Sequence, residues 1–482
     1  MNQREILERL SALLSDYLSR QKSDGFVRYK DPQELQGVLE LDKRCDNGDW
    51  SQIFCWIEKY LEFSVKTGHP GFLNRMWEGA NLPSILGEMV IAASNTSSCT
   101  YESAPVSTLM EKYMLEEMLE LVGFRNGEGQ MTTGSSNANM IAMMAARNEH
   151  QGDIKREGLF NQKKMYAFVS DDAHYSLEKA ANILGIGTDH LIKIPVTAMG
   201  EMDVAILEER LKKTIAEGGL PFFVAGTAGT TVRGAYDPIP ELLELKNKYS
   251  FWLHIDGAWG GAVLVSDILR EKYMRGIEQV DSLTWDFHKM LGTALMCNVF
   301  LINSRVHTLG QVCSGGDDSY LFQKREGNTG EGNTGEGNAV LNLGEVSLQC
   351  GRKVDSLKWF LDWKFFGRKG FAKRVEATLE LCRYAEKVVA GHDKLELVLP
   401  RNSFNICFRY RSNDGKADKL NLAIRKKLYH DGISLVGIAY HQNRPFLRLL
   451  LANHDLSSLD IDHYFQQVVE TGKYLEEKVY DN

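Results

Sequence analysis

The sequence predicts an α/β fold built on a mostly parallel sheet. From about residue 115 to residue 300, apolar runs of strand length alternate with longer segments in which apolar residues recur at helical spacing. Alternation of this kind predicts strands buried beneath helices on both faces of one sheet. The apolar runs are KMYAFVS, PFFVAGT, FWLHID and NVFLIN, accompanied by helical segments such as ANMIAMMAARNEH and IPELLELKNKY. In sheets of this class, ligands bind beyond the carboxyl ends of the strands.

The bulk composition favours a small-molecule ligand. The 482 residues exceed the size at which one hydrophobic core stops growing, and 43% apolar and 25% charged residues are typical of globular proteins. A formal net charge of −8, without a dense run of Lys or Arg, disfavours nucleic acid and anionic membranes as partners. No stretch approaches the ~18 continuous apolar residues of a membrane span, and the N-terminus lacks the apolar core of a signal peptide.

The eight cysteines are scattered along the chain, without CxxC or Cys/His spacing. This pattern predicts reduced thiols in a cytoplasmic protein rather than a disulfide framework or a zinc site. We therefore expect no structural metal.

The composition also predicts that the chain divides into three structural parts. Residues 1–70 are predicted to form charged, aromatic-rich helices with too little core of their own, so we expect them to pack on another surface, with a partner subunit as the candidate. Residues 71–355 would form the large domain. Residues 356–482 would form a smaller C-terminal α/β domain.

An aspartate and a lysine carry the first chemical signal. The run FWLHID ends at Asp256, and the small residues after it let backbone approach a flat ligand closely. Lys289 follows in DSLTWDFHKML, where a desolvated amine would be suited to forming an imine. Taken alone, Asp256 is as consistent with a structural carboxylate, and a lone lysine is usually a surface residue. Together they supply the carboxylate and the amine that pyridoxal phosphate requires.

Three further segments match the other needs of that cofactor. Ser135 and Ser136 stand at a predicted helix start, where amides and hydroxyls bind phosphate, although an ordinary helix cap has the same pattern. His174, after the run AFVS, would supply a flat partner for the ring, although a single histidine is more often structural. Thr231, in GTAGTTVRGAYDP, would place a hydroxyl near the same strand ends.

These residues lie in longer stretches that resemble the group II pyridoxal-phosphate amino-acid decarboxylases, within the glutamate and cysteine-sulfinate decarboxylase branch. The resemblance spans about residues 60–455. It implies the type I, aspartate-aminotransferase-like fold, with a mostly parallel seven-stranded sheet in the large domain, and a homodimer with shared active sites. The shared stretches are SVKTGHPGFLN, NTSSCTYESAPV, AHYSLEKAA, GTAGTTVRGAYDPI, LHIDGAWGGAVL, DSLTWDFHKMLG, SYLFQ and QCGRKVDSLKWFLDWK.

The resemblance also implies residue roles. Lys289 would bind the cofactor covalently, Asp256 would hold the pyridine nitrogen and His174 would stack on the ring as the three catalytic residues. The cofactor-binding residues that it implies are Lys289, Asp256, His174, Ser135, Ser136, Thr231, Ala258, His288 and Asp286. The substrate-binding residues that it implies are Arg448, which would hold the substrate carboxylate, Ser97, Cys99 and Arg75.

The expected reaction is decarboxylation of a small acidic L-amino acid to the amine and carbon dioxide. The candidate substrates are cysteine sulfinate, cysteate, aspartate and glutamate. The segment NTS, ending at Ser97, resembles the sulfinate-type enzymes, and Cys99 replaces the aromatic residue usual in the branch, which predicts a wider pocket.

Two departures from the family pattern stand near the predicted phosphate site. Asp286 replaces the usual asparagine, as in diaminobutyrate-type relatives, and Arg75 replaces the usual glutamine. A carboxylate near a phosphate is unfavourable unless a cation offsets it. We therefore expect Arg75 to lie close to Asp286, with a solvent-facing Arg75 as the alternative.

The segment REGNTGEGNTGEGNAV replaces part of the family's mobile loop, which carries a tyrosine thought to protonate the reaction intermediate. That tyrosine's place aligns near Gly337, and no tyrosine occurs between Lys324 and Gln349. Its composition predicts a flexible segment, and a tolerated surface insertion is the plainer alternative.

Three other functions stay open. The first is decarboxylation linked to oxidative deamination or transamination, which would give an aldehyde. The second is a diaminobutyrate-type decarboxylase. The third is a non-catalytic paralogue, which the intact Lys289, Asp256 and His174 disfavour.

Overall fold

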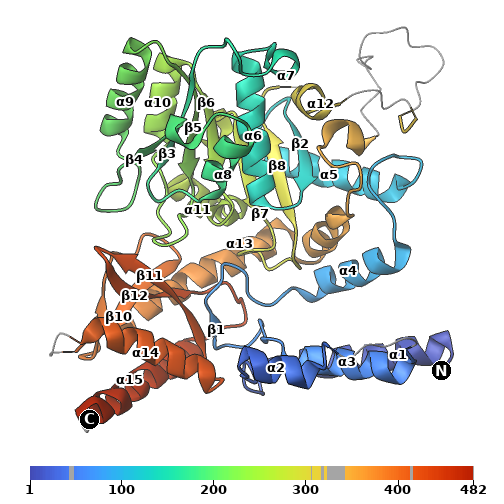
Figure 1. Ribbon diagram of the computed structural model, residues 1–482, viewed down its shortest axis with the longest axis vertical. Helices are drawn as coiled ribbons and strands as arrows, with labels where there is room; N and C mark the ends of the chain where they lie inside the picture. The colour runs from blue at the N-terminus through green and yellow to red at the C-terminus, as the bar shows by residue number, and fades with distance from the viewer. Residues whose placement is uncertain (43–47, 306, 316–319, 323–341, 413–415, 481–482) are drawn as a thin grey trace. The chain divides into compact units, whose positions relative to one another are not determined.

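A computed structural model of the chain (Figure 1) describes residues 1–482 except 43–47, 306, 316–319, 323–341, 413–415 and 481–482. The chain divides into two compact units. Residues Ala80–Leu379 form the large unit, and residues Met1–Gly79 together with Glu380–Asn482 form the terminal unit. Among the described helices, none has the length and apolar character needed to cross a bilayer.

The large unit is built on a seven-stranded sheet with the strand order β2-β8-β7-β6-β5-β3-β4. Strand β8 runs antiparallel to both of its neighbours, and the other adjacent pairs are parallel. This arrangement confirms the predicted mostly parallel sheet. The strands are β2 (Glu128–Thr132), β3 (Met165–Ser170), β4 (Leu191–Ile194), β5 (Leu220–Thr227), β6 (Trp252–Asp256), β7 (Ser282–Asp286) and β8 (Asn298–Ile302).

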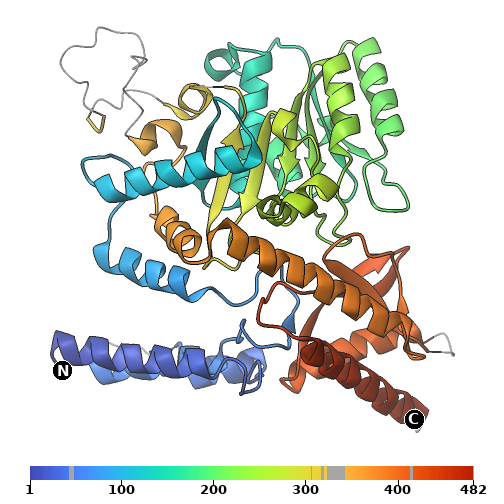
Figure 2. The ribbon, with the colours of Figure 1, turned by 180° about the vertical axis from the view of Figure 1, so that it is seen from behind.

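Helices cover both faces of this sheet. Helices α6 and α8 lie in front of it in Figure 1, and α5, α9 and α10 lie in front of it in the reverse view of Figure 2. Alanines on the inner face of α6 let it pack closely on the strands. The helices are α4 (Leu82–Ser94), α5 (Pro105–Val122), α6 (Ser135–His150), α7 (Ile154–Glu157), α8 (Ser176–Ile183), α9 (Val204–Ala216), α10 (Ile239–Tyr249), α11 (Asp267–Tyr273) and α12 (Thr308–Cys313).

The terminal unit contains a five-stranded sheet with the order β1-β11-β12-β10-β9. Its strand β1 pairs in parallel with β11, which joins the N-terminal residues to the C-terminal ones. The strands are β1 (Phe72–Leu73), β9 (Leu395–Leu397), β10 (Asn405–Tyr410), β11 (Leu435–His441) and β12 (Arg444–Leu450). The helices are α1 (Gln3–Ser19), α2 (Pro32–Leu39), α3 (Trp50–Phe63), α14 (Ala417–His430) and α15 (Ser458–Tyr480).

Helix α13 (Asp355–Ala390) carries the chain from the large unit into the terminal unit, with a break in helical geometry at Gly367. The two compact units therefore differ from the predicted division at residues 70 and 355, because β1 pairs with a C-terminal strand. Packing of residues 1–70 on a partner subunit stays a prediction.

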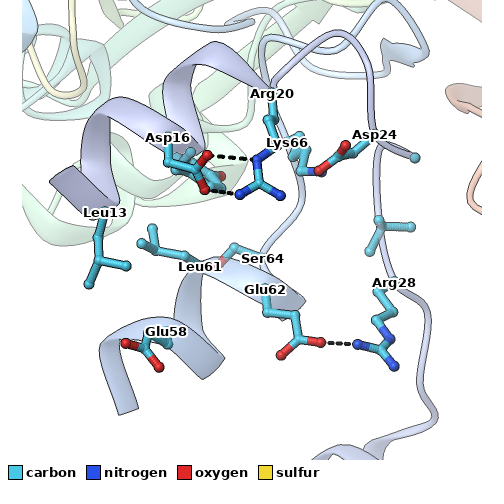
Figure 3. Close-up of a pocket in the computed structure, with 13 residues that line it drawn as sticks. Leu13, Asp16, Arg20, Asp24, Arg28, Glu58, Leu61, Glu62, Ser64 and Lys66 are labelled. Atoms are coloured by element: carbon cyan, nitrogen blue, oxygen red, sulfur yellow. Dashed lines mark hydrogen bonds and ion pairs between the residues drawn. The ribbon is translucent and has the colours of Figure 1, made fainter. Parts of the chain in front are cut away.

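A cavity of about 550 Å³ lies beside α1 and α3 within the terminal unit (Figure 3). Most of its charged lining residues pair with one another. Arg20 pairs with Asp16, Lys66 Nζ lies 2.9 Å from an oxygen of Asp24, and a further arginine and glutamate pair across the cavity in the same way. None of the predicted site residues lines this cavity.

Candidate active site

Asp256 is buried at the carboxyl end of β6, in the middle of the large sheet. The residue is 3% exposed, and Thr227 and Thr284 of the adjacent strands are its register partners. The backbone N–H of Ala258 donates to Asp256 Oδ1 over 3.1 Å, and Asn139 Nδ2 donates to Oδ2 over 2.8 Å. Each carboxylate oxygen has two lone pairs, so both oxygens keep acceptor capacity toward a ligand N–H.

A chain of hydrogen bonds in the core orients the amide of Asn139. Its Oδ1 accepts from His254 Nε2 over 3.0 Å, and His254 Nδ1 lies 2.8 Å from Ser282 Oγ. The Asp256 carboxylate can only accept, so Asn139 directs its NH₂ group to Asp256 and its oxygen to His254, whose Nε2 therefore donates. The Ser282 hydroxyl then donates to the unprotonated Nδ1 and accepts from Trp252 Nε1 over 2.8 Å. Burial lowers the pKa of His254 to about 4, which leaves a neutral ring with its proton on Nε2.

Lys289 meets a second buried carboxylate just beyond the end of β7. Its Nζ lies 3.0 Å from Asp286 Oδ2, and Ser135 donates a hydrogen bond to the same oxygen. Asn298 Nδ2 donates to Asp286 Oδ1, and His288 Nε2 lies 3.8 Å from Oδ2. Burial raises the pKa of Asp286, but the charges of Lys289 and His288 outweigh it and leave that pKa below its usual value.

Asp286 thus has its cation within the large unit. Arg75, which was predicted to offset it, belongs to the terminal unit, where its side chain is exposed. Proximity of Arg75 to Asp286 stays a prediction, and the described ion pair with Lys289 already satisfies the need for a positive charge.

His174 lies after β3 and belongs to the same electrostatic cluster. Burial lowers the pKa of His174, and the charges of Asp256 and Lys289 act on it in opposite directions. Its Nδ1 accepts from the backbone N–H of Ser176 over 3.3 Å, so a neutral ring carries its proton on Nε2. The ring is half-buried and therefore able to offer a face to a ligand.

The start of α6 forms a cradle for an anion. Ser135 is its first residue, and no side chain caps the helix after Gly134. The unpaired amides and the dipole at a helix start favour a negatively charged group. Gly134 has a φ of +121°, a backbone conformation that residues with a side chain rarely adopt, so glycine is favoured at this position. Ser136, the next residue, is exposed.

Closely packed loops surround the same strand ends. A Cβ on Gly229, whose φ is +82°, would lie 2.9 Å from the backbone nitrogen of Gly260, so the loops after β5 and β6 pass without room for a side chain. Thr231 is half-buried in the first loop, and Ala258 is buried in the second. His288 Nδ1 lies 2.7 Å from the carbonyl oxygen of Cys297, which fixes its ring beside Asp286.

This donor set fits pyridoxal phosphate. Asp256 keeps acceptor capacity for the pyridinium nitrogen, Lys289 supplies an amine for the aldehyde, and the uncapped start of α6 suits the phosphate. Within the described ranges, no group of three or more His, Cys, Asp or Glu residues is arranged to hold a metal ion.

Comparison with known proteins agrees with the geometry. The family model described as the pyridoxal-dependent decarboxylase conserved domain matches residues 32–411. The chain belongs to the pyridoxal-dependent decarboxylase family. It is a PLP-dependent amino-acid decarboxylase, and its cofactor is pyridoxal 5'-phosphate, as the sequence predicted.

Two curated relatives of this decarboxylase extend over nearly the whole chain. Cysteine sulfinic acid decarboxylase of Homo sapiens is 33% identical over 465 residues, which cover 94% of this chain and 92% of the relative. Acidic amino acid decarboxylase GADL1 of Bos taurus is 32% identical over 463 residues, which cover 94% and 87%. The crystal structure of mouse CSAD in apo form superposes with a TM-score of 0.88 at 30% identity, over 96% of this chain and 99% of that one. The predicted type I fold is confirmed.

The predicted substrate-binding residues of this decarboxylase lie in both units. Ser97 Oγ accepts from the backbone N–H of Arg352 over 3.0 Å, and Cys99 is buried, both within the large unit. Arg448 lies on β12 of the terminal unit, where its Nη2 donates to the carbonyl oxygen of Asn74 over 2.9 Å. Their joint role in binding substrate stays a prediction. The repeat-containing segment around Gly337 lies outside the described residues.

Sequence reasoning missed Asn139 and His254 of this decarboxylase. Asn139 stands in a segment predicted only as an amphipathic helix, and His254 stands inside the apolar run FWLHID. Both side chains are fully buried, and buried polar groups require partners. The available signal was therefore a polar residue at a position predicted to be apolar.

Proposed function

We propose that this chain decarboxylates a small acidic L-amino acid, with cysteine sulfinate, cysteate, aspartate and glutamate as candidates, to the amine and carbon dioxide. The observation that carries the reaction class is the cluster of Lys289, Asp256 and His174 at the carboxyl edge of the large sheet. The substrate class is supported by the names of the relatives that cover 94% of the chain.

Pyridoxal phosphate, when bound, supplies an electron sink that stabilises the carbon from which carbon dioxide departs. Lys289 would hold its aldehyde carbon, Asp256 its ring nitrogen, and Ser135, Ser136 and the start of α6 its phosphate. The remaining residues that would line the cofactor are His174, Thr231, Ala258 and His288, together with Asp286 as the ion-pair partner of Lys289.

Asp256 keeps a proton on the ring nitrogen in this proposal. Its carboxylate receives the N–H groups of Asn139 and Ala258, which complement its negative charge and fix its orientation before any ligand binds. A buried carboxylate aimed in this way favours a cationic N–H at its remaining lone pairs.

His174 is the candidate for moving a proton to the substrate carbon after carbon dioxide leaves. Its Nε2 carries the proton in the neutral ring, because Nδ1 accepts from Ser176. This assignment matters because the segment from Lys324 to Gln349 contains no tyrosine.

An arginine cluster in the terminal unit supports an acidic substrate. Burial lowers the pKa of Arg448, and the charge of Arg75 lowers it further. The pKa of Arg425 is lowered in the same way, chiefly by burial and in part by Arg75. An anion bound among these arginines relieves the electrostatic repulsion between them. A substrate with two acidic groups therefore suits this cluster better than a basic substrate does.

The test is product balance on a panel of amino acids. The purified enzyme, saturated with cofactor, is incubated with cysteine sulfinate, cysteate, aspartate, glutamate, 2,4-diaminobutyrate and an aromatic amino acid. Carbon dioxide, amine, aldehyde and peroxide are measured together. Carbon dioxide matched by amine from an acidic substrate supports the proposal. Aldehyde in comparable yield, or turnover of diaminobutyrate alone, would replace it with one of the alternatives.

The missing loop tyrosine has its own test. If aldehyde is a major product, a Gly337→Tyr variant should raise the amine fraction, because it puts a phenol at the position that aligns with the family's proton-donating tyrosine. An unchanged product ratio would show that the loop position is not the determinant.

We further propose a cytoplasmic homodimer. An apolar stripe on α4, formed by Leu82, Leu86, Met89 and Val90, is exposed within the large unit, as expected of a face that another subunit covers. The seven cysteines in the described part of the chain are free thiols, which suits a reducing compartment. Sedimentation of the wild type and of a Leu86→Glu, Val90→Glu double variant tests the dimer, and a monomeric wild type would contradict it.

A further inference from the structure

Two thiols from distant parts of the sequence face each other in the large unit. Cys99 follows α4, and Cys350 precedes α13. Their sulfur atoms are 3.9 Å apart, and neither cysteine is in a disulfide. A disulfide requires the sulfur atoms to approach to about 2.05 Å, so the remaining distance is within reach of side-chain rotation and small backbone shifts.

The backbone around the two thiols already holds the segments together. The N–H of Ser98 donates to the carbonyl oxygen of Arg352 over 3.0 Å, and the N–H of Arg352 donates to Ser97 Oγ over 3.0 Å. The guanidinium of Arg352 also donates to the carbonyl oxygen of Ser98 over 2.8 Å and pairs with the buried Glu111. These contacts keep Cys99 and Cys350 within reach of each other.

The two thiols differ in access to solvent. Cys350 is exposed, whereas Cys99 is 7% exposed and burial raises its pKa to about 11. Oxidation of cysteine follows exposure, so a dissolved oxidant reaches Cys350 first. Cys99 then stands as the neighbouring thiol that can resolve the oxidised sulfur.

We propose that Cys99 and Cys350 form an oxidation site at which a hydroperoxide converts the two thiols into a disulfide. The sulfur of Cys350 attacks the terminal oxygen of the hydroperoxide, so an S–O bond forms and the O–O bond breaks, and the departing oxygen takes the Cys350 proton and leaves as an alcohol, or as water when the oxidant is hydrogen peroxide. The sulfur of Cys99 then attacks the sulfenic sulfur, so the S–S bond forms, the S–O bond breaks and the departing hydroxide takes the Cys99 proton. The thiol pair loses two electrons and the peroxide gains them.

A disulfide here would tie two segments together. The carbonyl oxygen of Cys99 accepts from the N–H of Gly344 over 2.8 Å, and the N–H of Tyr101 donates to Asn342 Oδ1 over 3.1 Å. A Cβ on Gly344 would lie 2.7 Å from Cys99 Sγ, so the sulfur has little free space on that side. The cross-link would therefore fix the 97–101 segment against residues 342–352.

The effect on turnover rests on the proposed function, because Ser97 and Cys99 are predicted to bind substrate. Fixing their segment should raise the KM for an acidic amino acid several-fold and change kcat less, since the cofactor cluster around Asp256 lies outside the cross-linked segments. Reduction with dithiothreitol should restore the KM.

The cross-link is tested by mass spectrometry of the cofactor-saturated enzyme. After treatment with hydrogen peroxide, removal of the peroxide and blocking of free thiols, trypsin releases peptide 76–112 with Cys99 and peptide 326–352 with Cys350. We expect these peptides to be joined, with a mass lower than their sum by the two lost hydrogens, and to separate after dithiothreitol.

Matched variants make the result specific. Cys99→Ser and Cys350→Ser should each abolish the joined peptides, whereas Cys55→Ser, which removes another exposed thiol on α3, should retain them. Separate peptides with Cys350 oxidised to the sulfinic or sulfonic acid would overturn the proposal. The peptide result needs no turnover, so it stays readable even if the proposed substrate class fails. A joined pair with an unchanged KM would overturn the effect on substrate binding.

Discussion

Asp256 and Asp286 are buried carboxylates that end neighbouring strands of the large sheet, but different groups satisfy them. Asp256 receives neutral N–H donors from Asn139 and Ala258, and no ion pair to it occurs among the described residues. Asp286 forms an ion pair with Lys289 and accepts a hydroxyl from Ser135. Asp256 is thus oriented for a cationic ligand group, whereas in the proposed site the Lys289 amine would have to leave Asp286 to reach the cofactor.

This difference assigns distinct tasks to the two sites. The hydrogen-bond chain behind Asp256 runs into the core through Asn139, His254 and Ser282, so it is suited to orienting the carboxylate. The ion pair at Asp286 engages the Lys289 amine, which would have to leave the carboxylate before it could bond to an aldehyde. In the proposed site, attachment of the cofactor to Lys289 would therefore compete with the ion pair to Asp286.

The largest expected effect is that of removing the amine. A Lys289→Ala variant should lose decarboxylase activity by roughly a thousandfold or more, because the covalent link to the cofactor cannot form. Carbon dioxide release measures it. A Lys272→Ala variant, which removes an exposed lysine on α11, should retain wild-type activity. Substantial activity in Lys289→Ala would mean that another lysine carries the cofactor.

A change at Asn139 tests orientation of Asp256. Asn139→Leu should weaken cofactor affinity about tenfold and lower the free energy of unfolding by about 1–3 kcal/mol, because His254 and Asp256 lose a buried partner. Cofactor titration and urea denaturation measure the two effects. Ser176→Ala removes a hydrogen bond to Asn139 without touching Asp256, so it should affect stability only. Equal affinity losses in both variants would contradict the orienting role.

The pH dependence of stability tests the neutral state of His254. An unfolded histidine has a pKa near ~6.5, and the folded value is about 4. At a pH above the pKa of the unfolded chain, His254 is neutral in both the folded and the unfolded state. As the pH falls from the pKa of the unfolded chain toward the pKa of folded His254, the histidine is protonated in the unfolded chain but not in the folded one. The free energy of unfolding should therefore fall by about 1.4 kcal/mol per pH unit. In a His254→Gln variant that slope should be shallower, as measured by urea denaturation at several pH values, and equal slopes would count against a neutral His254.

The smallest expected effect is at the ion pair. Asp286→Asn should tighten cofactor binding about threefold to tenfold, because it removes a carboxylate beside the phosphate and releases Lys289 from its salt bridge. Equilibrium titration of the apoenzyme measures it. Asp267→Asn, which removes an exposed carboxylate paired with Arg368, is the control. Weaker cofactor binding in Asp286→Asn would instead make Asp286 a positive contributor to the site.

The sequence predicted the parts of the site that local pattern encodes. Asp256 and Lys289 follow apolar strands, and Ser135 precedes a helical pattern, so their place at the carboxyl edge of the sheet followed from the strand–helix alternation. Contacts between helices and strands that lie far apart in the sequence could not be predicted from local pattern. The bond from Asn139 to Asp256 joins residues 117 positions apart, and the pairing of β1 with β11 brings together residues even farther apart. Such pairings depend on packing and register, which residue periodicity does not specify.

The most direct test of the account is to locate the covalent cofactor. The purified protein is saturated with pyridoxal phosphate, reduced with borohydride and digested, and the modified lysine is identified by mass spectrometry. In the wild type we predict a single modified residue, Lys289. In the Asn139→Leu variant at limiting cofactor, we predict a loss of labelling at Lys289. Modification spread over surface lysines, or concentrated on a lysine other than Lys289, would contradict the account.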